Sequence, residues 1–204
     1  MPSSGRKNLA LSSHGAVVLP SLTFIGQGTL QTFWAALWRH FVDVDRIIDG
    51  NIEECWSFPA TTAQIGIRLS DYVVIDYLTI THATNTSNRA SAPRELIVWG
   101  MIGGDENLAE LQKAHKTYNA LLSRVTQLHT GIQPSTIGRG HHLWVPLAAI
   151  SYAPSAKPQQ FPVFKEVSKL NIEFGILIIQ VVNNWGDFFT TMCEIEVFGT
   201  PLGY

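Results

Sequence analysis

Histidines are the first residues of this chain whose type could support chemistry. His115, His129, His141 and His142 could be considered metal ligands. Zinc sites need a set of histidine, cysteine or acidic ligands at suitable spacing, and the adjacent pair His141-His142 has no such support nearby. The pattern is more typical of polar surface, so no metal site is predicted from these residues.

The two cysteines allow three interpretations. Cys55 or Cys193 could form a nucleophile pair with His82, but both lie in strand-like or apolar sequence, which favours unreactive thiols. They are then either two buried thiols or one disulfide, and a disulfide requires an oxidising compartment. In such a compartment the sequon at Asn85 would be a glycosylation acceptor.

Known catalytic motifs are missing from the sequence. It has no glycine-rich phosphate loop, no helical histidine pair around a glutamate and no serine in a nucleophile elbow. We therefore expect a protein that is not an enzyme and that requires no cofactor.

The composition predicts one folded domain. The 204 residues are 46% hydrophobic and 15% charged, with a net charge of -2, which argues against nucleic acid as the main partner. No apolar run reaches the roughly 18 residues of a membrane span, and residues 1–11 lack the apolar core typical of a signal peptide. Residues 1–7 are polar and are expected to be a disordered tail.

Short apolar segments separated by turn residues predict about eight strands. The expected strands are 9–22, 64–69, 72–81, 95–101, 143–152, 160–165, 174–182 and 192–197. We expect the last two to form a hairpin, and 143–152 to form another with 160–165. This pattern predicts a mostly β protein, a β-sandwich or jelly roll.

Two segments interrupt the strand pattern. Residues 105–128 have apolar side chains at alternating spacings of three and four, which predicts one inserted amphipathic helix of about six turns. It is expected to pack on its own domain, with self-association as the alternative. The aromatic residues of 32–44 fit a short helix or a β-ribbon, either packed in the core or exposed as an apolar flap.

Several short blocks of the sequence resemble a SUN domain (Sad1/UNC-84 homology) in the right order. They are residues 9–16 (LALSSHGA), 37–38 (LW), 55–59 (CWSFP), 67–70 (IRLS), 91–95 (SAPRE), 184–186 (NWG) and 198–199 (FG). They extend over most of residues 8–204, the expected domain. The resemblance implies a trimerising β-sandwich that binds the C-terminal tail of a KASH protein in the perinuclear space. Such an adaptor would link the nuclear membranes to the cytoskeleton as part of a LINC complex.

The resemblance also assigns peptide-binding residues. Segment 24–44, which includes Leu37 and Trp38, falls where the family has a lid that clamps the peptide by strand addition. His82 and Ser91 match positions of the pocket that holds the peptide's terminal carboxylate, which needs hydrogen-bond donors.

The C-terminal part of that pocket is harder to align. Counting back from Gly199 places the family's cysteine at Thr191 and its pocket tyrosine at Cys193, whereas counting forward from Trp185 shifts the match by one. Cys193 is therefore expected among the peptide contacts. Residues i and i+2 share a strand face, so Cys193 could also reach Cys55.

Further expectations follow from the same resemblance. Asp49, Gly50, Asn51 and Glu54 overlie a loop whose backbone carbonyls hold a monovalent cation, K⁺ or Na⁺. Thr23 replaces a cysteine that in many members bonds covalently to the peptide, so that link is expected to be lost. The helix at 105–128 looks inserted, and a homotrimer is expected when upstream helices are present.

Two alternative functions remain open from the sequence. A carbohydrate-binding β-sandwich would use exposed aromatics such as Trp34 and Trp38. A diverged SUN-like domain without peptide binding would serve structurally, associating through the inserted helix. Localisation at the nuclear envelope is implied by the resemblance alone, and membrane attachment would require an anchor outside this chain.

Overall fold

The computed structural model describes residues 6–26, 44–82, 89–128, 142–155 and 157–202. Its strands are β1 (Val17–Ile25), β2 (Trp56–Phe58), β3 (Ala63–Thr81), β4 (Pro93–Met101), β5 (Trp144–Ser151), β6 (Gln159–Pro162), β7 (Phe174–Asn184), β8 (Thr190–Met192) and β9 (Glu194–Thr200). The helices are α2 (Asp105–Lys113), α3 (His115–Leu128) and α4 (Lys165–Ser168), with short 3-10 turns η1 (Ser12–His14), η3 (Val44–Ile48) and η4 (Arg89–Ser91).

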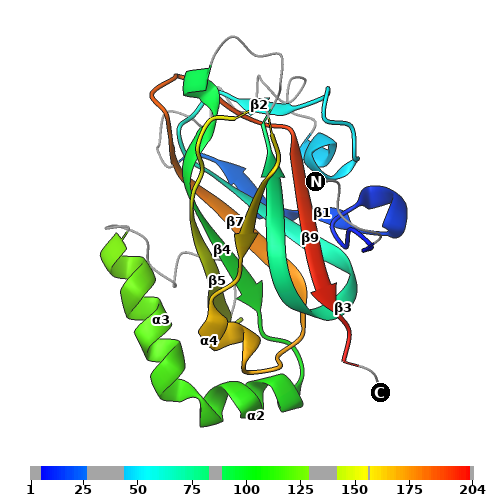
Figure 1. Cartoon of the computed structure of the whole chain (residues 1–204), viewed down its shortest axis with the longest axis vertical. Coiled ribbons are helices and arrows are strands. Elements are labelled where there is room, and N and C mark those ends of the chain that lie inside the picture. Colours follow the sequence, from blue (N-terminus) through cyan, green and yellow to red (C-terminus); the bar gives the residue numbers. More distant parts are fainter. Residues whose placement is uncertain (1–5, 27–43, 83–88, 129–141, 156, 203–204) are drawn as a thin grey trace.

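The fold is a β-sandwich whose two layers share the long strand β3. The first half of β3 lies in the antiparallel order β1-β3-β7-β4-β5, and its second half pairs with β6 and β9. The register with β7 shifts between Arg68 and Val73, where the strand passes from one layer to the other. Figure 1 shows this bend at the lower end of the molecule. The predicted mostly β sandwich is confirmed.

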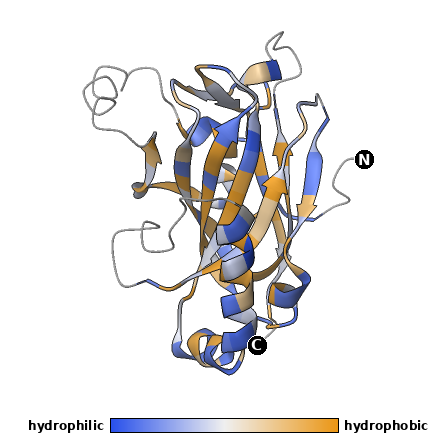
Figure 2. Ribbon diagram, turned by 90° about the vertical axis from the view of Figure 1, so that its left-hand side faces the viewer, coloured by the Kyte–Doolittle hydropathy of each residue, from blue (hydrophilic) through white to orange (hydrophobic). Residues whose placement is uncertain are grey.

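The core lies between these layers. Ile65, Ile67, Ile179 and Val181 point inward from the first layer, and Ile80 points inward from the second. The strands are the most hydrophobic parts of the ribbon in Figure 2. Burial alternates along β9, whereas β4, β5 and β7 are buried on both faces over most of their length.

Both predicted hairpins are wrong. β7 pairs with β3 and β4, whereas β8 pairs with β2 and β9 pairs with β3. Likewise β5 pairs with β4 and β6 pairs with β3. Consecutive strands cross between layers here because an apolar strand such as β7 needs a neighbour on each side, and those neighbours come from distant sequence.

Three predicted boundaries also change. Segments 64–69 and 72–81 form the single strand β3, and 9–22 contains η1 before β1 begins at Val17. The predicted helix 105–128 is two helices that change direction at Ala114. No helix in the described ranges has the length and apolar character needed to cross a membrane.

Helix α3 covers part of the outer face of the first layer. Its Val125 is fully buried with Trp99, Trp144 and Ile178 in a second, smaller apolar cluster. The amphipathic face predicted from the sequence therefore packs on its own domain, since it shields aromatic side chains that the sheet would otherwise expose.

Candidate functional site

Four segments meet at the upper end of the sandwich in Figure 1: the end of β3, the start of β4, the end of β5 and the β7–β8 turn. His82 follows β3 directly, and Ser91 ends η4 just before β4. Their side chains are buried, with 3% and 5% exposed. We call this region the tip site. Polar side chains this deeply buried are found where hydrogen bonds compensate them.

His82 is held by two hydrogen bonds. Its backbone N–H donates to the Tyr152 hydroxyl over 3.1 Å, and its Nδ1 lies 3.1 Å from the Thr191 carbonyl oxygen. A carbonyl only accepts, so Nδ1 carries the proton and Nε2 of the neutral ring has none. Burial lowers the pKa of His82, and the bond to Thr191 opposes that shift only in part. The ring offers a second donor only after protonation, which revises the simple donor role expected from the sequence.

Tyr152 belongs to the tip site although sequence reasoning missed it. Its hydroxyl accepts from His82 and donates to the Ser155 carbonyl over 3.3 Å. Burial raises the pKa of Tyr152, so the hydroxyl stays protonated at neutral pH. A tyrosine ending an apolar strand before Ala153-Pro154 was the available signal, because buried tyrosine usually finds a partner for its hydroxyl.

The β7–β8 turn is rigidly bonded through Asn184. The Asn184 amide donates to the carbonyls of Asp187 and Phe189, both over 2.9 Å, and its oxygen accepts from Gly186 N–H. Gly186 has a φ of 109°, a conformation that favours glycine. Trp185 ties the turn to the neighbouring strand segments, with its indole N–H donating to the Tyr152 carbonyl over 3.0 Å.

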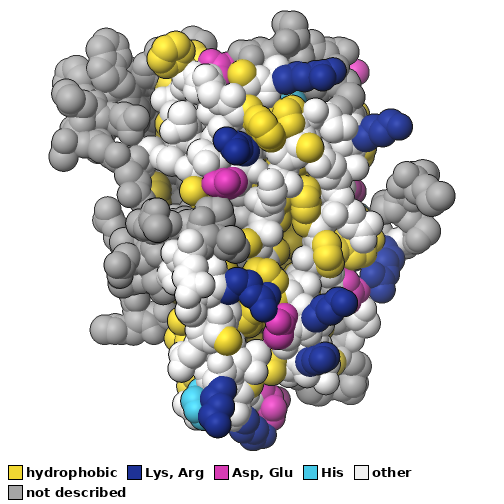
Figure 3. All heavy atoms as spheres, turned by 60° about the vertical axis from the view of Figure 1, so that its left-hand side comes forward, with side chains coloured by type: hydrophobic (Ala, Val, Ile, Leu, Met, Phe, Trp, Pro, Cys, Tyr) yellow, Lys and Arg dark blue, Asp and Glu magenta, His cyan; other side chains and the backbone are white. Residues whose placement is uncertain are grey.

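This rigid turn carries exposed aromatic rings. Trp185, Phe188 and Phe189 are 42%, 88% and 43% exposed, and the Arg94 guanidinium lies 4.9 Å from the Trp185 ring centre. Hydrophobic and basic side chains appear together at the upper end of the space-filling view in Figure 3. The exposure of these three rings was not predicted from the sequence.

Cys55 and Cys193 are joined by a disulfide across 138 residues of sequence. The bond fastens β2 to the end of β8, whose strands pair through Trp56 and Met192. Cys193 is fully buried. Its sulfur is therefore engaged in the disulfide, and its expected place among the peptide contacts stays a prediction.

The expected cation loop follows η3. Asp49 Oδ1 accepts from Asn51 N–H over 2.7 Å, and Asn51 Oδ1 accepts from Glu53 N–H over 3.1 Å. Glu54 forms an ion pair with Arg46, and Gly50 turns the chain with a φ of 82°. Asp49 Oδ1, Asn51 Oδ1 and the Glu54 carboxylate therefore each have a partner within this part of the chain. The monovalent cation expected at this loop stays a prediction.

Glu194 lies close to that loop, and its carboxyl stays protonated to an unusually high pH. It follows the disulfide on β9, directly opposite Thr81 of β3. Burial, and then the negative charges of Glu196 and Asp49, raise the pKa of Glu194 to about 7. The described residues contain no group of three or more His, Cys, Asp or Glu side chains suited to a metal.

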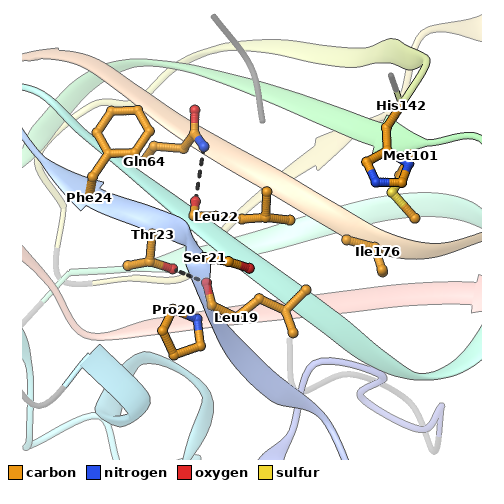
Figure 4. A pocket seen from close by; sticks show the side chains of 10 residues that line it. All are labelled: Leu19, Pro20, Ser21, Leu22, Thr23, Phe24, Gln64, Met101, His142 and Ile176. Carbon is orange, nitrogen blue, oxygen red and sulfur yellow. Dashed lines mark hydrogen bonds between the residues drawn. The ribbon is translucent and has the colours of Figure 1, made fainter. Parts of the chain in front are cut away.

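A separate cavity of about 710 Å³ lies on the outer face of the first layer, beside β1. It is lined by Leu19, Pro20, Ser21, Leu22, Thr23, Phe24, Gln64, Met101, His142 and Ile176. We call it the β1 pocket (Figure 4). It exists because β1 bulges: its register with β3 jumps from Leu19–Gly66 to Phe24–Gln64.

Thr23 secures the bulge that forms this pocket. Its hydroxyl donates to the Leu19 carbonyl over 2.8 Å and accepts from Gly66 N–H over 3.1 Å. The position at which the family resemblance expects a reactive cysteine therefore holds a structural hydroxyl group. Leu37, Trp38 and Asn85 lie outside the described residues, as does most of the expected lid.

Comparisons with known proteins identify relatives by sequence and by fold. The family model described as Sad1 / UNC-like C-terminal matches residues 42–127. The human "SUN domain-containing protein 5" is 21% identical over 174 residues, covering 82% of this chain and 36% of the relative. The Caenorhabditis elegans "Nuclear migration and anchoring protein unc-84" is 23% identical over 96% of this chain and 16% of its own length. The chain therefore resembles the SUN-domain family, through the model match over residues 42–127 and relatives of low identity.

The SUN-like chain spans less than two-fifths of each of these two relatives. Among solved structures, the family 32 carbohydrate-binding module of C. perfringens NanJ, determined with galactose, superposes with a TM-score of 0.54. The match has 11% identity and covers 94% of this chain and 98% of that module. At this identity the likeness establishes the sandwich fold alone.

Proposed function

We propose that this SUN-like domain binds the C-terminal tail of a KASH protein and acts as a non-catalytic adaptor at the nuclear envelope. The peptide's terminal carboxylate would enter the tip site between His82 and Ser91. The observation that carries the proposal is the burial of these two polar side chains on the segments that the family resemblance assigns to the carboxylate pocket.

The chemistry of the tip site supports this assignment. A carboxylate leaving water needs hydrogen-bond donors, and the Ser91 hydroxyl supplies one without a change of charge. His82 supplies another when it is protonated, and its bond to Thr191 already fixes the orientation of the ring. The rigid Asn184 turn keeps the neighbouring strand segments in place, which limits the entropy lost on binding.

The test compares KASH-tail peptides with free and amidated C-termini in calorimetric titrations. The free peptide should bind at least tenfold more tightly, and Ser91→Ala should remove about tenfold of that affinity, the typical effect of a hydrogen bond to a charged group. Equal affinity for both peptides, on folded and trimeric protein, would overturn the proposal.

The cation and the trimer are parts of the same proposal. K⁺ or Na⁺ would be held by backbone carbonyls of residues 49–54, next to Asp49 and to the Glu194 carboxyl, whose pKa is about 7. Exchange of both ions for N-methylglucamine should then lower the melting temperature of the domain. Trimerisation is proposed to need upstream helices, so mass photometry should compare the domain with and without an attached trimeric coiled coil.

A carbohydrate-binding function is the second candidate. The aromatic trio Trp185, Phe188 and Phe189 favours it, because sugar rings stack on exposed aromatic faces, and the NanJ module of similar fold was solved with galactose. A glycan array would test it. Selective binding lost in Trp185→Ala or Trp38→Ala, but kept in Ser91→Ala, would favour this function over peptide binding.

A further inference from the structure

We infer that the aromatic trio of the β7–β8 turn enters the headgroup region of a lipid bilayer, and that basic side chains around the turn bind anionic phospholipids. The basic side chains are Arg89, Arg94 and Lys157, all exposed. The inference goes beyond the proposed function, because it concerns a lipid surface and does not need the carboxylate pocket.

The first argument is the exposure of three large apolar rings within five consecutive residues. Phe188 is 88% exposed, and Trp185 and Phe189 are 42% and 43% exposed. The hydrogen bonds of Asn184 fix the backbone of the turn, so the rings cannot move into the core without breaking them. An apolar patch that the fold itself keeps exposed marks a contact surface, and Trp and Phe favour the interface of a bilayer.

The second argument is the basic side chains around these rings. The Arg94 guanidinium lies 4.9 Å from the Trp185 ring centre. Arg89 belongs to η4, which contacts the turn through a backbone hydrogen bond of 3.3 Å from Trp185 N–H to the Ala92 carbonyl. Lys157 lies in the loop after β5, to which the Trp185 indole N–H donates. Figure 1 shows the turn beside η4 at the upper end of the sandwich.

Two acidic side chains in the same region are held by hydrogen bonds within the protein. Glu95 accepts from Asn183 Nδ2 over 2.8 Å, and Asp187 Oδ1 accepts from Phe188 N–H over 2.6 Å. Both are half-buried, whereas the three basic side chains are exposed. The surface around the rings therefore presents more positive than negative charge, which complements the negative surface of an anionic bilayer.

A bilayer fits this turn better than a protein or a sugar does. A stable protein interface buries about 800 Å² on each partner, far more than a five-residue turn offers. A sugar needs polar groups beside the aromatic ring, and the turn already uses its Asn184 amide, Trp185 indole N–H and Asp187 Oδ1. Apolar rings enter a bilayer interface without hydrogen-bond partners, and exposed cations are attracted to its anionic headgroups.

The test is sedimentation of the full chain with vesicles of phosphatidylcholine alone or mixed with phosphatidylserine. We expect binding to the mixed vesicles, weaker binding to phosphatidylcholine alone, and loss of affinity at high salt. Phe188→Ser should reduce partitioning at least tenfold, since it removes the burial of one phenylalanine ring. Lys157→Gln should reduce it about fivefold, the effect of one cation near an anionic surface.

Two matched controls lie at the other end of the molecule. Tyr72→Ser removes a 60% exposed ring at the bend of β3, and Lys113→Gln removes an exposed cation at the end of α2. Both should bind the mixed vesicles as the wild type does, and thermal melts establish that each variant folds. Glycerophosphoserine, the headgroup without acyl chains, should not displace the vesicles. Equal partitioning of Phe188→Ser and wild type, or no binding to the mixed vesicles, would overturn the inference.

Other partners of the turn would give different results. A glycan-array signal or a dimer in mass photometry that Phe188→Ser abolishes, without vesicle binding, would assign the turn to a sugar or a second copy and overturn the inference. Failure of the proposed function is distinguishable, because Ser91→Ala should weaken binding of a KASH-tail peptide and leave vesicle binding unchanged, whereas Phe188→Ser should do the reverse. If Ser91→Ala weakened vesicle binding as much as Phe188→Ser, the lipid contact would lie in the tip site and the inference would be wrong.

Discussion

His82 and Glu194 both lie near the chain segment around Cys193 and show how burial acts on a base and on an acid. His82 contacts the carbonyl of Thr191, two residues before Cys193, and Glu194 immediately follows that cysteine. Burial drives both groups toward their neutral forms, so it lowers one pKa and raises the other. The difference lies in their neighbours. A carbonyl partially offsets the shift of His82, whereas like charges increase the shift of Glu194.

The two groups therefore give stability opposite slopes with pH. The folded-state pKa of His82 is below its unfolded value near 6.5, so the free energy of unfolding decreases as pH falls below that value. The folded-state pKa of Glu194 is about 7 against 4.5, so stability falls as pH rises from 4.5 to 7. Between the folded-state pKa of His82 and 6.5 the two slopes oppose each other, and from 6.5 to 7 the ionisation of Glu194 alone lowers stability.

Removal of the disulfide is expected to have the largest effect. The double variant Cys55→Ser and Cys193→Ser should lower the free energy of unfolding by about 3 kcal/mol, because the bond closes a long loop. Urea denaturation measures this change. The His82 pKa should also rise toward its ordinary value, since a loosened β8, whose Thr191 contacts the ring, would admit water and reduce the desolvation of His82.

Reduced wild-type protein is the control for that variant and should match its stability. A variant as stable as the oxidised wild type would mean that the β2–β8 pairing stabilises this region without a contribution from the disulfide. An unchanged His82 pKa, read from NMR titration, would separate the tip site from the disulfide.

Peptide binding is expected to change next most strongly, through protonation of His82. A carboxylate favours the imidazolium form, so affinity for a KASH-tail peptide should rise as pH falls from 7.5 through the His82 pKa. One added charge-assisted hydrogen bond corresponds to about tenfold. Calorimetric titration across this range measures the slope.

The matched variant is His82→Gln, whose amide can still donate to the Thr191 carbonyl but does not titrate. It should bind with an affinity that changes little between pH 7.5 and 5.5. A pH slope that survives in this variant would assign the titration to another group, and Glu194 is the first to examine because its pKa lies in the same window.

The sequence predicts the presence of these elements much better than their pairing. The apolar run of β7 and the alternation in β9 are local patterns, and both strands were predicted from them. Their separation into different sheets depends on contacts with β3 and β4 that no local pattern encodes. The break at Ala114 was missed for a similar reason, because the apolar spacing continues through it.

The candidate site was predictable only in part. His82 and Ser91 were identified from blocks resembling the SUN family, and the structure buries both at one end of the sandwich. Tyr152 was missed because it reaches His82 only through a tertiary contact. The β1 pocket was missed as well, since it depends on a bulge that the alternation of β1 does not reveal.

Substitution of Glu194 should give the smallest change in stability, and it tests the comparison of His82 with Glu194 most directly. In sequence it alternates with Ile195 and looks like an ordinary solvent-facing carboxylate, yet the loop containing Asp49 makes it half-buried.

Glu194→Gln removes the charge that is poorly tolerated above pH 7. After allowance for its partial exposure and solvent screening, the variant should be about 1 kcal/mol more stable than the wild type at pH 8. At pH 5, where Glu194 is protonated when folded, most of that gain should disappear. Urea denaturation at both values measures the difference, and Glu53→Gln on the exposed side of the same loop should show no such dependence. An equal effect of Glu194→Gln at both pH values would mean that the carboxyl is ionised throughout, and that the neighbouring charges are neutralised by something bound at the loop.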